Sequence, residues 1–138
     1  MNRTEFLRNL IVGVGSIFSF VSFSANGQTN KSRATKIAIL DTHMAGFKHY
    51  DGQFFDPNFL KPGTKLALKP EPNNKFDSKA IAIYYYNNKL GYIPQSENTA
   101  IFNLLKHNKK LLTQITGYNP ETYHWQGYYF TVYLVEGY

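Results

Sequence analysis

The chain has 138 residues, which is enough for one domain with a hydrophobic core but too short for two ordinary domains. Its 15 basic and 9 acidic side chains give a net charge of +6, a balance that suits polyanionic partners as well as general solubility. Cysteine is absent, which excludes a disulfide framework and leaves the redox compartment undecided.

The first residues have the layout of an export signal. Arg3 and Arg8 precede an uncharged apolar run at 10–23, and small residues follow at 24–27. The apolar run is shorter than the roughly 20 residues that a membrane-spanning helix needs. We therefore expect residues 1–25 to be a signal peptide and the protein to be exported to the periplasm or secreted. The alternative is that this segment stays uncleaved and anchors the protein in the inner membrane.

The folded domain is expected to follow a polar linker and to consist mainly of β-strands. Residues 26–34 are small and polar, which predicts a flexible linker and places the domain at residues 35–138. Apolar or alternating runs in the domain predict strands, and turn-forming residues separate them. The expected strands are 36–40, 64–69, 80–86, 89–93, 111–118 and 127–135.

Two of these strands are expected to form a hairpin. Ile81 and Ile83 alternate with Ala82 and Tyr84, which is the pattern of a strand with one buried face. Asn87-Asn88 is the expected two-residue turn, because asparagine tolerates a positive φ.

Prolines and helical periodicity set the other boundaries. Pro70 and Pro72 lack backbone donors and are expected to end pairing of the strand before them. One helix is expected from Glu97 to about Asn108, with Ser96 as its N-cap. Its apolar face has helical spacing at Ala100, Ile101, Leu104 and Leu105. This pattern predicts a mostly β domain, a small and partly open barrel of five or six strands with one main α-helix.

The sequence offers little that predicts catalysis. Its histidines are scattered, without cysteine partners or metalloprotease spacing, so neither a zinc site nor a cofactor is expected. They are His43, His49, His107 and His124.

One enzyme alternative remains. Asp56, Asp77 and Lys79 loosely match the acidic pair and lysine of metal-dependent nucleases, in which two carboxylates hold Mg²⁺. The competing interpretation is that Asp77 caps the turn into the next strand while Lys79 points to solvent.

Three segments resemble the HIRAN domain family in their order and spacing. They are Gly46-Phe47-Lys48-His49-Tyr50, the run EPNNKFDSKAI at 71–81, and KLGYIP at 89–94. The family carries a glycine followed by a basic-aromatic cluster, a core close to R-E-P-x-N-x-[YF]-D-x-N-A-I, and a terminal L-G-Y-[VI]-P. The resemblance covers roughly Ile37 to Tyr133.

This resemblance implies an OB-like β-barrel that binds and does not catalyse. The best-understood members bind the 3′ end of single-stranded DNA, where aromatic side chains stack on terminal bases and an aspartate accepts a hydrogen bond from the 3′-hydroxyl. Lys48-His49 stands where those members have arginine and then tyrosine. Carried over by position, the expected nucleic-acid-binding residues are Lys48, His49, Tyr50, Asn73, Asn74, Phe76, Asp77 and Tyr92.

A second class of function stays open beside DNA binding. An exported module on the same fold is a candidate to bind a protein or glycan partner through two tyrosine-rich surfaces, Tyr84–Tyr86 and Tyr128–Tyr133. A membrane contact is expected only through residues 1–25, if they are not cleaved.

Overall fold

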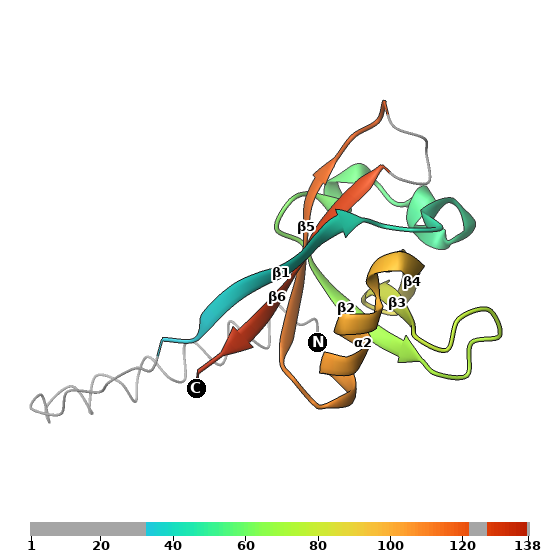
Figure 1. Ribbon diagram of the computed structural model, residues 1–138. Coiled ribbons are helices and arrows are strands. Elements are labelled where there is room, and N and C mark those ends of the chain that lie inside the picture. Colours follow the sequence, from blue (N-terminus) through green and yellow to red (C-terminus); the bar gives the residue numbers. More distant parts are fainter. Residues whose placement is uncertain (1–32, 122–126, 138) are drawn as a thin grey trace, which may run out of the picture. The chain divides into compact units, whose positions relative to one another are not determined.

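The computed structural model describes residues 33–121 and 127–137 of the chain. These residues form a six-stranded antiparallel sheet and one α-helix (Figure 1). The elements are β1 (Thr35–His43), β2 (Lys65–Glu71), β3 (Ala80–Tyr85), β4 (Asn88–Tyr92), α2 (Thr99–Lys106), β5 (Leu111–Tyr118) and β6 (Tyr128–Glu136). Short 3₁₀ helices connect them at η1 (Phe47–His49), η2 (Asp51–Phe54), η3 (Pro57–Leu60) and η4 (Gln95–Glu97).

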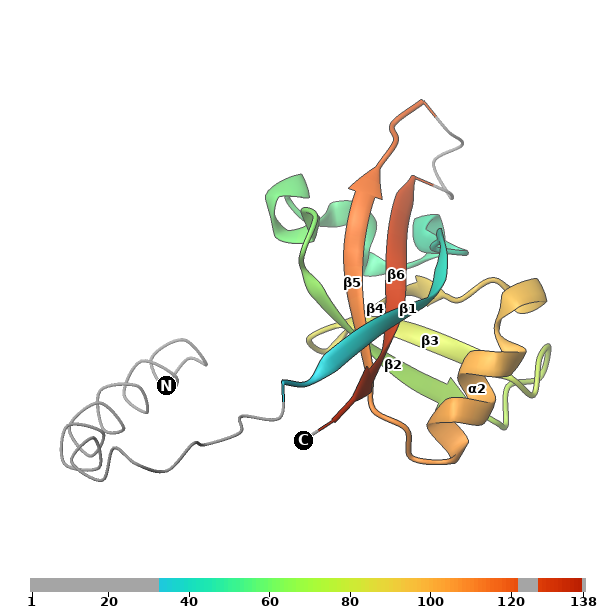
Figure 2. The same cartoon turned by 60° about the vertical axis from the view of Figure 1, so that its left-hand side comes forward.

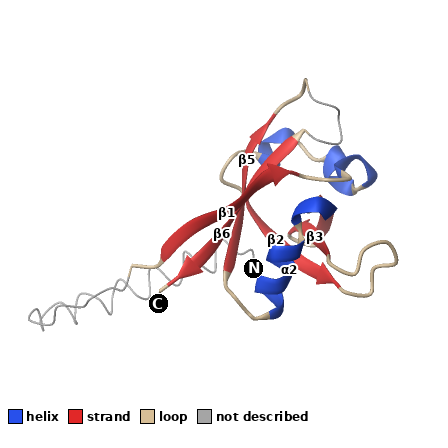
Figure 3. Ribbon diagram, viewed as in Figure 1, coloured by secondary structure: helices blue, strands red, loops and turns tan. Residues whose placement is uncertain are grey.

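The prediction of a mostly β domain with one main helix is confirmed, and strands dominate the picture in Figure 3. The predicted signal peptide at 1–25 and most of the predicted linker at 26–34 lie outside the described residues. Within the described part of the chain, no helix has the length and apolar character needed to cross a membrane.

The sheet curls so that its two edge strands approach each other. The strand order is β1-β6-β5-β2-β3-β4, which puts β1 and β4 at the edges. An isolated antiparallel bridge joins Ala45, just after β1, to Tyr92 at the end of β4. Each residue donates its N–H to the carbonyl of the other at 2.9 Å. The result is a small OB-like barrel that stays partly open, because this bridge takes the place of a continuous ladder.

The core lies inside the curled sheet. Tyr128, Phe130 and Val132, which share one face of β6, are all buried, and Thr131 on the other face is buried as well. The predicted alternation of β3 is wrong in its first half, where Ala82 is as buried as Ile81 and Ile83. β3 is an inner strand between β2 and β4, and α2 lies beside β2 and β3 in both views (Figures 1 and 2), so this part of the strand has neighbours beyond the curled sheet itself.

The hairpin turn lies one residue earlier than predicted. Tyr86 and Asn87 form the turn, with φ of +52° at Tyr86, and Asn88 already pairs with Tyr85 in β4. This register puts Gly91 opposite Ile83 and leaves Leu90 fully buried. Core packing and strand register therefore override the preference of asparagine for a positive φ.

Pro70 does not end pairing of its strand, contrary to the prediction. It lies within β2 and is paired with Ile81 of β3. On the other side of β2, β5 pairs with Lys65 and Leu66 alone, so this side of Pro70 faces no strand. A missing N–H is tolerated where no ladder needs it.

The predicted helix is present but shorter, and its predicted cap is wrong. α2 runs from Thr99 to Lys106, while Ser96 lies in the separate turn η4. Asn98 takes the N-cap position, and its side chain makes no capping hydrogen bond. Pro94 and the 3₁₀ turn after it delay the start of the α-helix.

The bridge between Ala45 and Tyr92 depends on glycine at position 91. A Cβ atom added to Gly91 would lie 2.4 Å from the carbonyl oxygen of Ala45 and 3.1 Å from the Met44 side chain. We predict that Gly91→Ala lowers the free energy of unfolding by about 1–3 kcal/mol, because the two backbones must separate. Chemical denaturation measures this change.

The matched control is Gly117→Ala, where an added Cβ meets nothing within 4 Å. Its unfolding free energy should stay within about 0.5 kcal/mol of the wild type. A Gly91→Ala protein as stable as this control would contradict the claim that the close approach constrains the fold.

Candidate functional site

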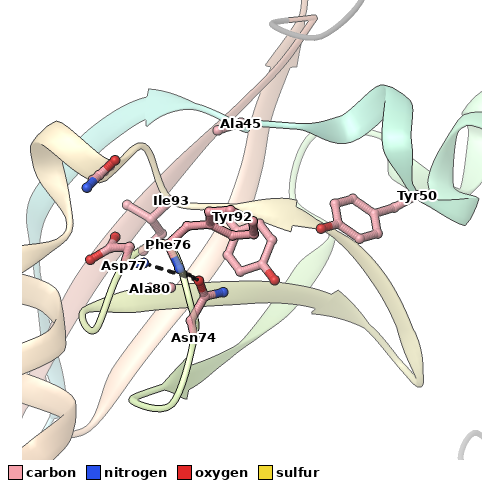
Figure 4. A pocket seen from close by; sticks show the side chains of 9 residues that line it. Ala45, Tyr50, Asn74, Phe76, Asp77, Ala80, Tyr92 and Ile93 are labelled. Atoms are coloured by element: carbon pink, nitrogen blue, oxygen red, sulfur yellow. Dashed lines mark hydrogen bonds between the residues drawn. The ribbon is translucent and has the colours of Figure 1, made fainter.

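A pocket of about 340 Å³ opens beside the bridge between Ala45 and Tyr92 (Figure 4). It has two sides that are far apart in the sequence: Tyr50, between η1 and η2, and the loop between β2 and β3. The end of β4 lies between them. The lining residues are Ala45, Tyr50, Asn74, Phe76, Asp77, Ala80, Tyr92, Ile93 and Gln95.

The structure brings together part of the predicted binding set. The predicted residues that line the pocket are Tyr50, Asn74, Phe76, Asp77 and Tyr92. Lys48 and His49 are exposed on η1, and Asn73 is exposed in the loop, and none of these three lines the pocket. The pocket therefore brings Tyr50 together with Tyr92 and with the loop that carries Asn74, Phe76 and Asp77. Binding of a ligand by Lys48, His49 and Asn73 stays a prediction.

Asn74 organises the loop between β2 and β3. Its side-chain oxygen accepts hydrogen bonds from the backbone N–H groups of Phe76 at 2.9 Å and Asp77 at 3.2 Å (Figure 4). Its own N–H donates to the carbonyl of Glu71 at 3.0 Å. Such local side-chain bonds fix a turn without a strand partner. They hold Phe76 at the pocket, where its ring is 92% exposed and accessible to a ligand.

Asp77 is held by one donor on each carboxylate oxygen. Its Oδ1 accepts from the backbone N–H of Lys79 at 2.9 Å, and its Oδ2 accepts from the side-chain amide of Asn98 at 2.7 Å. The predicted capping role of Asp77 is therefore confirmed. An ionised carboxylate offers about four acceptor positions, so it keeps acceptor capacity for a ligand in the pocket.

Glu71 connects both sides of the pocket. Its Oε1 accepts hydrogen bonds from the Tyr92 hydroxyl at 2.7 Å and the Asn74 amide at 3.1 Å, and its Oε2 pairs with the Lys89 ammonium at 2.8 Å. Lys89 also donates to the Tyr92 hydroxyl at 3.0 Å. Because that hydroxyl already donates once and accepts once, Tyr92 offers a ligand mainly its ring.

The two tyrosine rings of the pocket face each other edge to face. The ring centroids of Tyr50 and Tyr92 are 5.9 Å apart, with an angle of 63° between the planes. The Lys89 ammonium lies 5.0 Å from the Tyr92 centroid and 5.6 Å from the Tyr50 centroid, within the range of cation–π attraction. This places a positive charge beside both rings.

Burial and hydrogen bonding shift the ionisation of this cluster. Burial raises the pKa of the Glu71 carboxyl, but the hydrogen bonds from Lys89 and its neighbours outweigh it and hold that pKa below its usual value. Burial lowers the pKa of the Lys89 ammonium, but the hydrogen bond to Glu71 outweighs it and raises that pKa. Burial raises the pKa of the Tyr92 phenol to about 12. At neutral pH the cluster therefore contains a charged ion pair and a neutral phenol.

The residues of the nuclease alternative do not line one pocket together. Asp56 caps η3 by accepting a hydrogen bond from the N–H of Asn58 at 2.9 Å. Asp77 lines the pocket, but Asp56 and Lys79 do not line it. Among residues 33–121 and 127–137, no group of three or more acidic, histidine or cysteine side chains is placed to hold a metal ion.

Sequence reasoning did not assign roles to three side chains that support the pocket: Glu71, Lys89 and Asn98. Glu71 and Lys89 belong to the motif segments, but their pairing depends on the folded hairpin. Asn98 carries no sequence signal that connects it with Asp77, which precedes it by 21 positions.

The ion pair of Glu71 and Lys89 should make stability depend on acid pH. Folding lowers the Glu71 pKa below its ordinary value of 4.5. The stability that the ion pair contributes is therefore present above that pH and is lost as pH falls through the lower folded value. We predict that Glu71→Gln costs roughly 0.5–1 kcal/mol at neutral pH and that this difference shrinks below pH 4.5. Urea denaturation across pH measures it.

Lys89→Met should reduce the acid dependence in the same way, because Lys89 is the first cause that lowers the Glu71 pKa. Lys75→Met is the control, since Lys75 is exposed in the neighbouring loop. A cost of Glu71→Gln that stays constant down to pH 2 would contradict the assignment.

Comparisons with known proteins agree with the fold. A family model described as the HIRAN domain matches residues 37–136. A crystal structure of a protein from Lactobacillus plantarum aligns with a TM-score of 0.64 and 21% identity, covering 75% of this chain and 98% of that one. The HIRAN domain of human HLTF aligns with a TM-score of 0.59 and 16% identity, covering 74% of this chain and 78% of that one. No curated protein matches. Because the family model spans most of its length, the chain belongs to the HIRAN domain family.

Proposed function

We propose that this domain binds the 3′ end of single-stranded DNA in the pocket between Tyr50 and the loop of Phe76 and Asp77. HIRAN domains are known generally as DNA-binding modules without catalytic activity. Recognition of a free 3′ end is proposed because of the Asp77 carboxylate. Two donors hold this carboxylate in a pocket whose walls are otherwise mainly aromatic and apolar.

The aromatic rings supply sequence-independent affinity. Phe76 is almost fully exposed, and Tyr50 and Tyr92 line the pocket behind it. Stacking of a base on an aromatic ring is worth about 1–3 kcal/mol and tolerates any base. A pocket of about 340 Å³ is at the small end of the range for ligand sites, which suits a terminal nucleotide better than a duplex.

The carboxylate of Asp77 explains why an end would be preferred. An ionised carboxylate is an acceptor only, and it repels phosphate. The sugar–phosphate backbone of an internal nucleotide of DNA presents only acceptors, whereas a free 3′ terminus presents a hydroxyl donor. Asp77 therefore favours a 3′-hydroxyl and disfavours a 3′-phosphate at the same position.

Basic side chains near the pocket favour an approaching polyanion. Lys48 and His49 are exposed on η1, and Lys75 and Lys79 are exposed in the loop that carries Phe76. Attraction between lysines and phosphates weakens as salt is added, because the release of counterions from the DNA then becomes less favourable. Binding should therefore be measured at low ionic strength and should weaken as salt is added.

Oligonucleotides that differ only at the 3′ terminus test this proposal. The wild-type protein should bind a fluorescent oligonucleotide with a free 3′-hydroxyl more tightly than the same oligonucleotide with a 3′-phosphate. Asp77→Asn should weaken binding of the hydroxyl form by about 10- to 100-fold, the loss of a hydrogen bond to a charged group, and should remove the preference. Fluorescence anisotropy measures both affinities.

The control is Phe59→Ala, which removes an exposed ring that does not line this pocket. It should leave both affinities unchanged. Equal binding of the two oligonucleotides by the wild type, or no binding at low salt, would refute recognition of the end.

We propose a protein or glycan partner as the second candidate, because a separate aromatic groove lies outside the DNA pocket. This groove of about 310 Å³ is lined by Phe55, Phe59, Tyr85, Tyr86 and Asn88. Phe59 is 57% exposed and Tyr86 is 62% exposed, so its rings are accessible.

Of the two predicted tyrosine surfaces, the one at Tyr84–Tyr86 contributes to this groove. Tyr128 is buried against Phe47 and Tyr118, so the start of the other predicted surface belongs to the core. Export through residues 1–25, which stays a prediction, would present this groove to extracytoplasmic partners. Tyr86→Ala should then abolish partner binding, and Asp77→Asn should leave it intact.

A further inference from the structure

Asn98 occupies a helix N-cap position without capping the helix. Asparagine is among the preferred N-cap residues, because its side chain accepts a hydrogen bond from an amide of the first helical turn. At the start of α2, Asn98 has α-helical dihedral angles and makes no such bond. Its side-chain amide instead donates to the Oδ2 atom of Asp77 at 2.7 Å. The local interaction is replaced by a tertiary one that ends at the pocket.

The position of Asn98 is fixed from both directions along the chain. Its carbonyl accepts the N–H of Phe102 at 2.8 Å in the first turn of α2. The residue before it, Glu97, accepts a hydrogen bond from the hydroxyl of Thr42 in β1. Asn98 itself is only 2% exposed, so its amide has almost no access to water. A buried amide without its partner would cost about 1–3 kcal/mol, which favours the contact with Asp77.

The second donor changes what the carboxylate of Asp77 can do. The backbone N–H of Lys79 holds Oδ1, but a bond to one oxygen leaves the group able to turn about that bond. The Asn98 amide holds Oδ2 as well and so fixes the plane of the carboxylate. Hydrogen bonds to an ionised acceptor are stronger than neutral ones, which makes this restraint effective.

We propose that Asn98 is a positioning residue for 3′-end recognition. By fixing the plane of the Asp77 carboxylate, it directs the remaining acceptor positions of that group into the pocket and thereby sets the preference for a free hydroxyl over a phosphate. This inference rests on the proposed function of the pocket. Asn98 itself does not line the pocket and acts through Asp77.

The test is the ratio of affinities for the 3′-hydroxyl and 3′-phosphate oligonucleotides, measured by anisotropy. Asn98→Ala should lower this ratio at least threefold toward one, while affinity for the 3′-phosphate form does not fall by more than about twofold, because the stacking rings are unchanged. Asn98→Leu keeps the side-chain volume without the donor and serves as the second variant if the alanine protein folds poorly. It should lower the ratio to the same extent.

The matched control is Asn103→Ala, which removes an exposed amide from the same helix and should keep the wild-type ratio. If the wild type prefers the hydroxyl and Asn98→Leu keeps that preference, or loses both affinities by the same factor, the positioning role is wrong while the proposed function holds. If the wild type shows no preference, the proposed function itself has failed and the positioning role falls with it.

The contact can also be followed without DNA. Exchange of the Asn98 side-chain amide protons, measured by NMR, should be slow in the wild type and should accelerate in Asp77→Ala. Fast exchange in both proteins would overturn the proposal.

Discussion

The hydrogen-bonded bridge between Ala45 and Tyr92 joins the two edges of the sheet, and the pocket lies directly beside it. On one side, the chain continues from Ala45 through η1 to Tyr50. On the other side, Tyr92 contacts Glu71 and thereby the loop between β2 and β3. Without the bridge, these two sides would belong to opposite ends of an open sheet. Gly91 permits the close approach, so one glycine connects closure of the barrel to assembly of the pocket.

Two carboxylates lie close to a site that we propose binds a polyanion, and their surroundings give them different roles. Glu71 is compensated by the Lys89 ammonium and spends its oxygens on Tyr92 and Asn74, so it is a structural group. Asp77 is held by neutral amide donors, so its negative charge and part of its acceptor capacity remain available. A negative group of this kind is useful at a DNA pocket when the ligand offers a hydroxyl.

The sequence was informative where the contacts are local or belong to a known motif. Runs of apolar residues predicted the strands, and the motif segments contain Tyr50, Asn74, Phe76 and Asp77, which line the pocket. The loop of Asn74, Phe76 and Asp77 is shaped by hydrogen bonds between neighbouring residues. Prediction from the sequence failed where tertiary contacts determine the structure. Strand register places the hairpin turn at Tyr86–Asn87. Pro70 stays within β2 because one side of the strand has no partner there. The bond of Asn98 to Asp77 connects distant segments and replaces a local cap, which no local pattern encodes.

Locating the ligand on the domain tests most directly whether the pocket binds a 3′ end. Backbone and side-chain NMR resonances would be followed while an oligonucleotide with a free 3′-hydroxyl is added at low salt. If the pocket binds the 3′ end, the largest changes occur at the residues that line it beside the bridge, Tyr50, Asn74, Phe76, Asp77 and Tyr92. Changes concentrated instead at the groove of Phe59 and Tyr86, with the pocket unaffected, would contradict it.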